Sequence, residues 1–196
     1  MKVLIACEYS GTVRKAFREL GHDAWSCDLL PSDDNSEYHI KGDVAELLQK
    51  SWDLMIAHPP CTYLCNSGVH WLGRQKGREE KMREGALFFK TLLEANIPKI
   101  CVENPIMHKY AKQIIGCDYA QTVQPWQFGE DASKATCLWL KGLQKLEPTN
   151  VIKKDRYANQ TPSGQNKLGP SADRWKIRSK TYEGIARAMA EQWGKI

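Results

Sequence analysis

The sequence predicts an α/β fold in which a mostly parallel central sheet is covered by helices on both faces. Short apolar runs alternate along the chain with segments that have the spacing of amphipathic helices. Turns rich in glycine, proline or polar residues separate these segments, and the chain starts in the order strand, turn, helix, strand. This alternation is typical of parallel strands joined by helical crossovers.

Each expected strand is a short apolar run that stops at a turn. Gly11 follows the first run, and Pro59 and Pro60 follow the third, where they end it sharply. Pro105 follows the fourth run and suits the first turn of a helix that continues to about residue 115. The expected strands are residues 3–7, 23–28, 53–57, 99–102, 120–123 and 136–140.

The expected helices place apolar residues three or four positions apart. The clearest example puts Met82, Ala86 and Phe89 on one face, and Gly21 is a natural stop for the first helix. The expected helices are residues 12–20, 43–49, 78–94, 105–115 and 181–193. The stretches between them that we expect to be loops are residues 30–41 and 61–77.

Composition limits the class of protein. A chain of 196 residues with 42% hydrophobic and 26% charged residues suits one globular domain. The net charge of +5 permits a nucleic-acid partner without requiring one. The seven cysteines do not have the spacing of a disulfide framework or a zinc site. The first apolar run is too short for a signal peptide and no run of 18 apolar residues occurs, so we expect a cytoplasmic protein without a membrane span or a metal.

The candidate site is the edge of the sheet where the strands end. In parallel α/β sheets, ligands bind beyond the carboxyl ends of the strands. Polar or reactive residues follow four of the expected strands, at residues 8–11, Asp28, 58–61 and 103–105.

Cys61 and Glu103 suggest a reaction when they are considered together. Alone, Cys61 is either a thiolate nucleophile or a small buried apolar residue, and Glu103 is either a cleft residue or a capping or surface acid. Carbon 5 of cytosine becomes nucleophilic when a thiolate adds to carbon 6, and an acid that hydrogen-bonds N3 eases that addition. One cysteine and one protonatable glutamate meet both needs.

A methyl donor would need a site beside this pair. Gly11 allows the backbone to pass close to a ligand, or forms an ordinary tight turn. Asp28 stands at a strand end, where an acid accepts hydrogen bonds from ribose hydroxyls. Asp43 follows Gly42 and either caps the next helix or faces an adenine amino group.

Taken in order, these segments resemble the DNA (cytosine-5) methyltransferases. The resemblance is carried by residues 59–61 (Pro-Pro-Cys), 67–68 (Ser-Gly) and 103–104 (Glu-Asn). It implies a Rossmann-like fold, S-adenosylmethionine as the cofactor and DNA as the substrate. By this match Cys61 is the nucleophile and Glu103 contacts N3 of a flipped cytosine.

The resemblance also implies the residues that hold the cofactor and the base. Residues 3–11 match the part that binds methionine, and Tyr182–Ala188 loosely resembles the last family motif, which folds back onto the cofactor. The implied cofactor-binding residues are Cys7, Glu8, Tyr9, Ser10, Gly11, Asp28, Asp43 and Pro59. In the family, the loop after the cysteine closes over the base, so Trp71 either stacks there or anchors the loop to the core. The implied substrate-binding residues are Asn66, Ser67, Gly68, Trp71, Asn104 and Gln127.

The chain departs from the family in three places. The first motif keeps only Gly11 of the usual Phe-x-Gly-x-Gly, and Glu8 is unexpected there. The Gln-x-Arg-x-Arg element is absent, and we expect Lys134 or Gln127 to replace it in part, which makes Lys134 a third catalytic candidate. A short segment replaces the large target-recognition domain. We therefore expect a catalytic domain at 1–142 and 179–196, and a basic extended segment at 143–178.

The basic segment leaves the partner open. Its lysines and arginines either contact phosphates without reading sequence or form a solvated loop. Two alternatives to DNA methylation remain: the same chemistry on a free pyrimidine nucleotide or RNA, and a non-catalytic nucleic-acid-binding module on a methyltransferase fold. A homodimer would present two basic faces in place of the missing domain. Compact proteins of this kind resemble those of bacteriophages, which would place the chain in a host cytoplasm.

Overall fold

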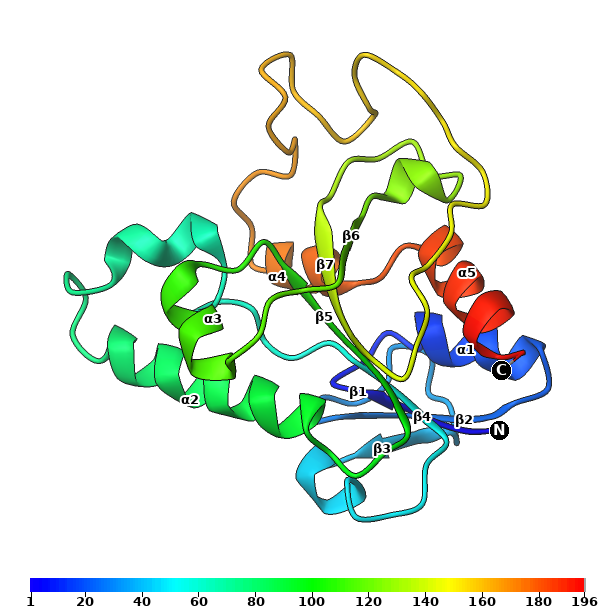
Figure 1. Cartoon of the computed structure of the whole chain (residues 1–196). Coiled ribbons are helices and arrows are strands. Elements are labelled where there is room, and N and C mark those ends of the chain that lie inside the picture. Colours follow the sequence, from blue (N-terminus) through cyan, green and yellow to red (C-terminus); the bar gives the residue numbers. More distant parts are fainter. Residues whose placement is uncertain (196) are drawn as a thin grey trace.

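A seven-stranded sheet forms the centre of the computed structural model, which describes residues 1–195 (Figure 1). The strand order is β3-β2-β1-β4-β5-β7-β6. The first five strands in this order are parallel, and β7 runs antiparallel to both of its neighbours. The prediction of a mostly parallel sheet is confirmed. The strands are β1 (Lys2–Ala6), β2 (Asp23–Asp28), β3 (His39–Lys41), β4 (Leu54–Ala57), β5 (Lys99–Pro105), β6 (Gln121–Val123) and β7 (Thr136–Lys141).

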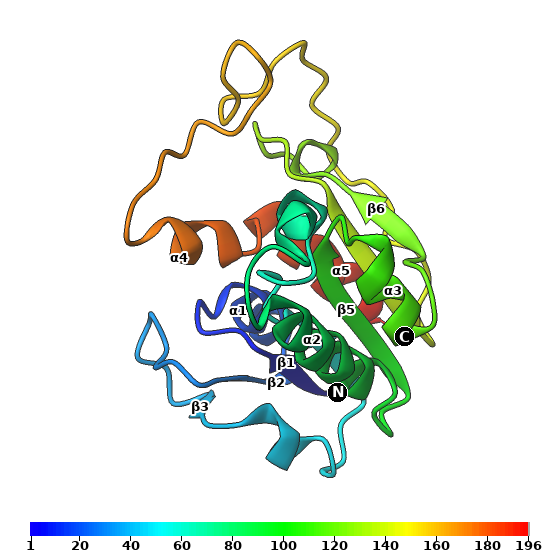
Figure 2. The ribbon, with the colours of Figure 1, turned by 90° about the vertical axis from the view of Figure 1, so that its left-hand side faces the viewer.

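Helices cover both faces of the sheet, as predicted. Helices α1 and α5 pack against each other on one face, and α2 and α3 lie on the other (Figures 1 and 2). Alternate residues of β1 serve the two faces: Val3 and Ile5 join the core under α1 and α5, while Leu4 and Ala6 join the other core. The helices are α1 (Thr12–Glu19), α2 (Arg78–Leu93), α3 (Lys109–Ile115), α4 (Arg174–Ser179) and α5 (Glu183–Trp193), with 3₁₀ turns η1 (Val44–Leu47), η2 (Asn66–Trp71) and η3 (Pro125–Gln127).

Strand β5 is longer than the sequence predicts. Glu103, Asn104 and Pro105 pair with β7 and therefore belong to the strand. The predicted helix start at Pro105 is wrong: α3 begins at Lys109, and the His108 side chain caps it by accepting a hydrogen bond from the backbone of the third helical residue. The partner strand lies about thirty residues further along the chain, so the local pattern contained no sign of this pairing.

Two details near β2 also differ from expectation. The expected loop at 30–41 contains β3, a three-residue strand whose His39 ring lies 2.9 Å from the Ser26 hydroxyl. So short and polar a strand has no clear periodicity. The expected helix at 43–49 is the 3₁₀ turn η1. Asp43 caps it by accepting from the backbone N–H of Ala45 at 2.9 Å.

The connections define one crevice at the edge of the sheet. From β1 the chain continues to β2 on one side, whereas β4 continues to β5 on the other, so the strand order reverses between β1 and β4. Ligands of such sheets bind beyond the strand ends at this point. After β7 the chain first packs against the core, where Leu146 is 1% exposed. Residues 151–173 then arch away from the sheet, and the chain returns through α4 (Figure 2). No helix in residues 1–195 is long and apolar enough to span a membrane.

Candidate active site

The turn after β4 presents Cys61. Its first residue, His58, donates its backbone N–H to Ala6 of β1 at 2.9 Å, which ties the turn to the centre of the sheet. The Cys61 carbonyl then accepts hydrogen bonds from the backbone N–H groups of Leu64 and Cys65, both at 3.0 Å. This single helical turn places residues 61 and 65 on the same side. The thiols of Cys61 and Cys65 are hydrogen-bonded to each other.

A buried histidine that the sequence analysis did not identify holds this turn in place. The His108 backbone N–H donates to the Leu64 carbonyl at 3.1 Å, and its ring Nε2 lies 3.0 Å from the Tyr63 carbonyl. Because Nδ1 accepts from Ala111, Nε2 is the nitrogen that carries the proton. His108 is only 3% exposed, so the ring fixes the Cys61 turn to the start of α3.

The environment of Cys61 favours the thiolate. The hydrogen bond from Cys65 lowers the pKa of Cys61 to about 7, although burial and the Glu103 carboxylate act to raise it. The positive charges of Lys134 and Arg178 lower it further. The same hydrogen bond raises the pKa of Cys65, so Cys65 stays protonated as the donor. A thiolate near neutral pH is what a nucleophilic cysteine needs.

Glu103 lies beside this turn and is paired with His58. The Glu103 Oε2 atom is 2.8 Å from His58 Nδ1, and both side chains are about nine-tenths buried. Burial acts to raise the pKa of Glu103. The hydrogen bond from His58 and the charge of Lys134 outweigh it, so the pKa lies below its usual range. The structure therefore holds Glu103 as a carboxylate.

Lys134 and Gln127, the expected substitutes for the family's arginines, occupy different positions. The charge of Lys134 reaches both Cys61 and Glu103, while its Nζ donates to the carbonyls of Arg178 at 2.9 Å and Lys180 at 3.5 Å. The side-chain oxygen of Gln127 accepts from the backbone of its own turn, η3, at 2.7 Å. Its amide nitrogen remains available to a substrate.

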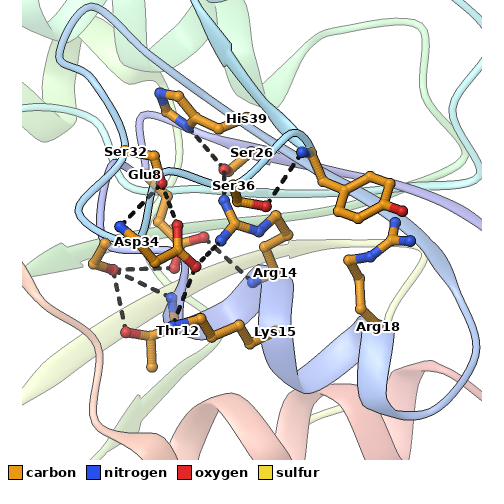
Figure 3. Close-up of polar contacts among 12 residues, drawn as sticks. Glu8, Thr12, Arg14, Lys15, Arg18, Ser26, Ser32, Asp34, Ser36 and His39 are labelled. Atoms are coloured by element: carbon orange, nitrogen blue, oxygen red, sulfur yellow. Dashed lines mark hydrogen bonds and ion pairs between the residues drawn. The ribbon is translucent and has the colours of Figure 1, made fainter.

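In the turn between β1 and α1, the side chain of Glu8 binds the free backbone N–H groups at the start of the helix. The carboxylate of Glu8, which is 4% exposed, accepts from the N–H groups of Val13 at 2.7 Å and Arg14 at 3.3 Å and from the Ser10 hydroxyl at 3.3 Å (Figure 3). Glu8 thus occupies the anion site at the start of α1. Gly11 adopts the left-handed conformation at φ 72°, and a Cβ there would lie 2.3 Å from the Arg14 guanidinium. In this structure Gly11 makes room for Arg14.

Arg14 ties α1 to β2 and to the loop that follows β2. Its side chain is 1% exposed and donates to the Ser26 hydroxyl at 2.8 Å and to the Asp34 carboxylate (Figure 3). Lys15 also pairs with Asp34, at 3.1 Å. Burial acts to raise the pKa of Asp34. Hydrogen bonds from Ser32, Arg14 and Lys15 outweigh it and hold that pKa well below its usual range.

Three expected cofactor residues meet at the ends of β1, β2 and β3. Ala6 is in register with Cys27 and Asp28 with Lys41, so Cys7, Asp28 and Asp43 lie at the same edge of the sheet. Burial raises the pKa of Cys7, and the charges of Asp28 and Asp43 add to the effect. Asp28 accepts one hydrogen bond, from the backbone of Leu30 at 2.9 Å. Cys7 has φ 58°, which is unusual for a residue with a side chain. The structure brings this predicted group together.

A segment that the sequence analysis did not place at the site, residues 176–181, covers the crevice. The Tyr9 hydroxyl donates to the Lys176 carbonyl at 2.8 Å, and Lys180 pairs with Asp33 at 2.6 Å. Beneath this cover lies a cavity of about 30 Å³. The residues that line it are Cys7, Glu8, Tyr9, Ser10, His58, Ser179 and Thr181.

The expected substrate residues divide into exposed and buried groups. Asn66, Ser67 and Gly68 lie on η2 together with Trp71, which is 49% exposed and contacts the His70 ring. Asn104 is fully buried on β5, and neither polar atom of its side chain has a hydrogen-bond partner within residues 1–195.

A larger cavity of about 470 Å³ adjoins Lys134. Its charged lining residues are all positive: Lys134, Lys167, Arg178 and Lys180. Among residues 1–195, Lys134 and Lys167 form no ion pair and donate only to backbone carbonyls. The basic segment therefore contributes an electropositive wall beside the Cys61 turn.

No family model and no curated protein matches the chain. A solved structure with a similar fold is described as a DNA modification methyltransferase encoded within an E. coli prophage; the match has 14% identity and a TM-score of 0.51 and covers 76% of this chain and 51% of that one. Two others are the methyltransferase EhMeth of Entamoeba histolytica (15%, TM-score 0.47, 76% and 57% covered) and a Dnmt2 methyltransferase of S. pombe (14%, 0.43, 73% and 50%). The chain spans about half the length of each. The first likeness establishes the predicted Rossmann-like methyltransferase fold.

Proposed function

We propose that this chain transfers a methyl group from S-adenosylmethionine to carbon 5 of cytosine in DNA, through a covalent adduct with Cys61. One observation carries the proposal: a cysteine whose pKa is lowered to about 7 lies beside the buried Glu103, at the carboxyl ends of the neighbouring strands β4 and β5. A nucleophile and a carboxyl group at this edge of the sheet are the two groups that the reaction requires.

The role of the protein's own residues in each step of the reaction follows from their arrangement in the site. The base leaves the helical stack, because carbon 6 cannot be reached inside a duplex. The Cys61 sulfur adds to carbon 6 while the Glu103 carboxyl group hydrogen-bonds N3, and carbon 5 becomes electron-rich. After methylation, carbon 5 loses its proton to water, the sulfur–carbon bond breaks, and Cys61 is restored as a thiolate.

The residues at the ends of β1 to β3 fit the adenosine half of the cofactor. Asp28 has one carboxylate oxygen left to accept from ribose hydroxyls, and Asp43 stands beside it in an exposed position. S-adenosylmethionine, when bound, supplies the electrophilic methyl group. Glu8 already takes the N–H groups at the start of α1, so the methionine half would have to rely on the cavity residues between Cys7 and Thr181. Residues 176–181 would have to move to admit it.

The electropositive cavity supports a nucleic-acid substrate. Four cationic side chains and no carboxylate line the cavity. One of the four is Lys134, whose charge also reaches Cys61. Phosphate contacts of this kind position a substrate without reading its sequence. The prophage protein of similar fold is described as a DNA modification enzyme, which agrees with DNA. The same cationic lining also suits the phosphate of a free pyrimidine nucleotide, which is the second candidate.

Methyl transfer with tritiated S-adenosylmethionine tests the proposal. We expect label on cytosine in duplex DNA, no label with Cys61→Ala, and undiminished label with Cys117→Ala, which removes an exposed thiol. Label on dCMP or RNA instead of DNA would show that the substrate is different while the chemistry is the one proposed. A folded protein that binds no cofactor by calorimetry and labels nothing would contradict the proposal and favour the non-catalytic module.

A further inference from the structure

The ring of His58 is buried between Glu103 and the small cavity at the end of β1. Nδ1 lies 2.8 Å from Glu103 Oε2, whereas Nε2 is buried without a hydrogen-bond partner within residues 1–195. The sheet fixes this pair: Ala57 of β4 is in register with Val102 of β5, so the residues that follow each of them lie side by side. Pro59 and Pro60 separate His58 from Cys61 and restrict their relative movement.

The pairing determines what Glu103 can do. A carboxylate only accepts hydrogen bonds, and Oε2 already accepts one from His58. Ionised Glu103 therefore cannot donate a proton to cytosine N3. A proton must reach the carboxylate first, and the group hydrogen-bonded to it is the imidazole.

The other charged or titratable neighbours are engaged elsewhere or lack a hydrogen bond to Glu103. Lys134 acts on Glu103 through its charge, but its Nζ donates to backbone carbonyls. On the cavity side, Glu8 caps α1 and the Tyr9 hydroxyl donates to Lys176. The thiols near Glu103 or His58 belong to Cys7, Cys61, Cys65, Cys101 and Cys137.

We propose that His58 is a positioning residue for Glu103 and stores the proton that Glu103 passes to the cytosine ring. This inference rests on the proposed function. The Nδ1 proton moves to the Glu103 carboxylate as Nε2 takes a proton from water in the adjoining cavity, and the resulting carboxylic acid gives its proton to N3 as the Cys61 sulfur bonds carbon 6. When that bond breaks, N3 returns the proton to Glu103, Glu103 returns it to Nδ1 of His58, and Nε2 releases its proton to water. The cavity of about 30 Å³ has room for a water molecule to exchange protons with Nε2.

Nitrogen NMR of the full chain tests the pairing without any catalysis. With ¹⁵N-labelled histidine, and His58→Asn to assign the signals, we expect His58 to carry a proton on Nδ1 at neutral pH. A free imidazole prefers the other tautomer, so a His58 that carries its proton only on Nε2 would overturn the proposal. This result stands whether or not the chain methylates DNA.

Kinetic measurements then distinguish a His58 that supplies a proton from a His58 that only orients Glu103. Asparagine retains an N–H donor for Glu103 but holds no transferable proton, whereas alanine lacks both. We expect His58→Asn and His58→Ala each to lower kcat about 100-fold or more while KM for DNA changes only a few-fold. His22→Ala, a histidine near the N-terminus, is the control. If His58→Asn restores the wild-type kcat, His58 only orients Glu103 and stores no proton. If the wild type labels no cytosine, the proposed function fails and the NMR result alone decides the pairing.

Discussion

The two turns that meet at the edge of the sheet are built in opposite ways. In the turn between β1 and α1, the buried carboxylate of Glu8 and the buried guanidinium of Arg14 both find partners. Around the Cys61 turn, four buried side-chain atoms lack one: His58 Nε2, Arg78 Nε and both polar atoms of Asn104, the complete set within residues 1–195. The buried charged groups of the β1–α1 turn are therefore hydrogen-bonded, whereas buried polar atoms around the Cys61 turn can still form hydrogen bonds.

This difference separates a turn whose buried polar groups stabilise the fold from one whose buried polar groups can still bond a ligand. Most buried polar groups in proteins are paired, and each exception costs free energy of folding. Exceptions near a cysteine proposed as a nucleophile are expected where a ligand completes the bonding. The comparison therefore predicts that substitutions in the first turn reduce stability, and that substitutions in the second reduce reactivity or even increase stability.

The largest effect on stability is expected at Arg14. Arg14→Ala removes a fully buried cation and leaves Ser26 and Asp34 without it, which should lower the free energy of unfolding by about 2–3 kcal/mol in urea denaturation. Asp34 has a lowered pKa, so the pair stabilises the fold above the unfolded-state value of about 3.9 and loses this contribution as pH falls. The gap between wild type and variant should therefore shrink in acid.

Arg18→Ala provides the matched control on the same helix. Arg18 is 28% exposed: it lies 3.9 Å from Asp23, donates to the Ala24 carbonyl at 3.2 Å and lies over the Tyr38 ring, so its loss should cost about 1 kcal/mol, less than that of the buried Arg14. Equal losses for the two arginines would show that the β1–α1 turn does not depend on the buried network.

The next effect concerns reactivity at the Cys61 turn. Cys65→Ala removes the hydrogen bond that lowers the pKa of Cys61 to about 7, so this pKa should return toward or above 9.0. The wild-type thiol becomes reactive as pH rises through about 7, and at that pH the variant should have about 50-fold less thiolate. Alkylation of the peptide that contains Cys61, followed by mass spectrometry across pH, measures the change. An unchanged pH profile, compared with Cys117→Ala, would show that Cys65 does not control the nucleophile.

The elements that flank the first turn were easier to predict than its side-chain network, in which Arg14 was not identified from the sequence. Strand β2 has the predicted bounds because its turns are local, and the crevice followed from the strand order. The site around Cys61 depends on contacts between distant residues: His58 with Glu103, and His108 with Tyr63. Local periodicity contains no information about such pairs. His58 directly precedes Pro-Pro-Cys, and that position was the one available signal.

The smallest effect, and the one opposite in sign, is expected at Asn104. Its side chain is fully buried without a partner, so Asn104→Leu replaces an unsatisfied amide with an apolar group of similar size and should raise the free energy of unfolding by about 1 kcal/mol. Methyl transfer should fall in the same variant if this amide serves the substrate or the turn during the reaction. A variant that is less stable than the wild type would mean that the amide is bonded in solution, and the contrast between the two turns would be lost. Asn104→Leu that is more stable and equally active would mean that unpaired groups here carry no function.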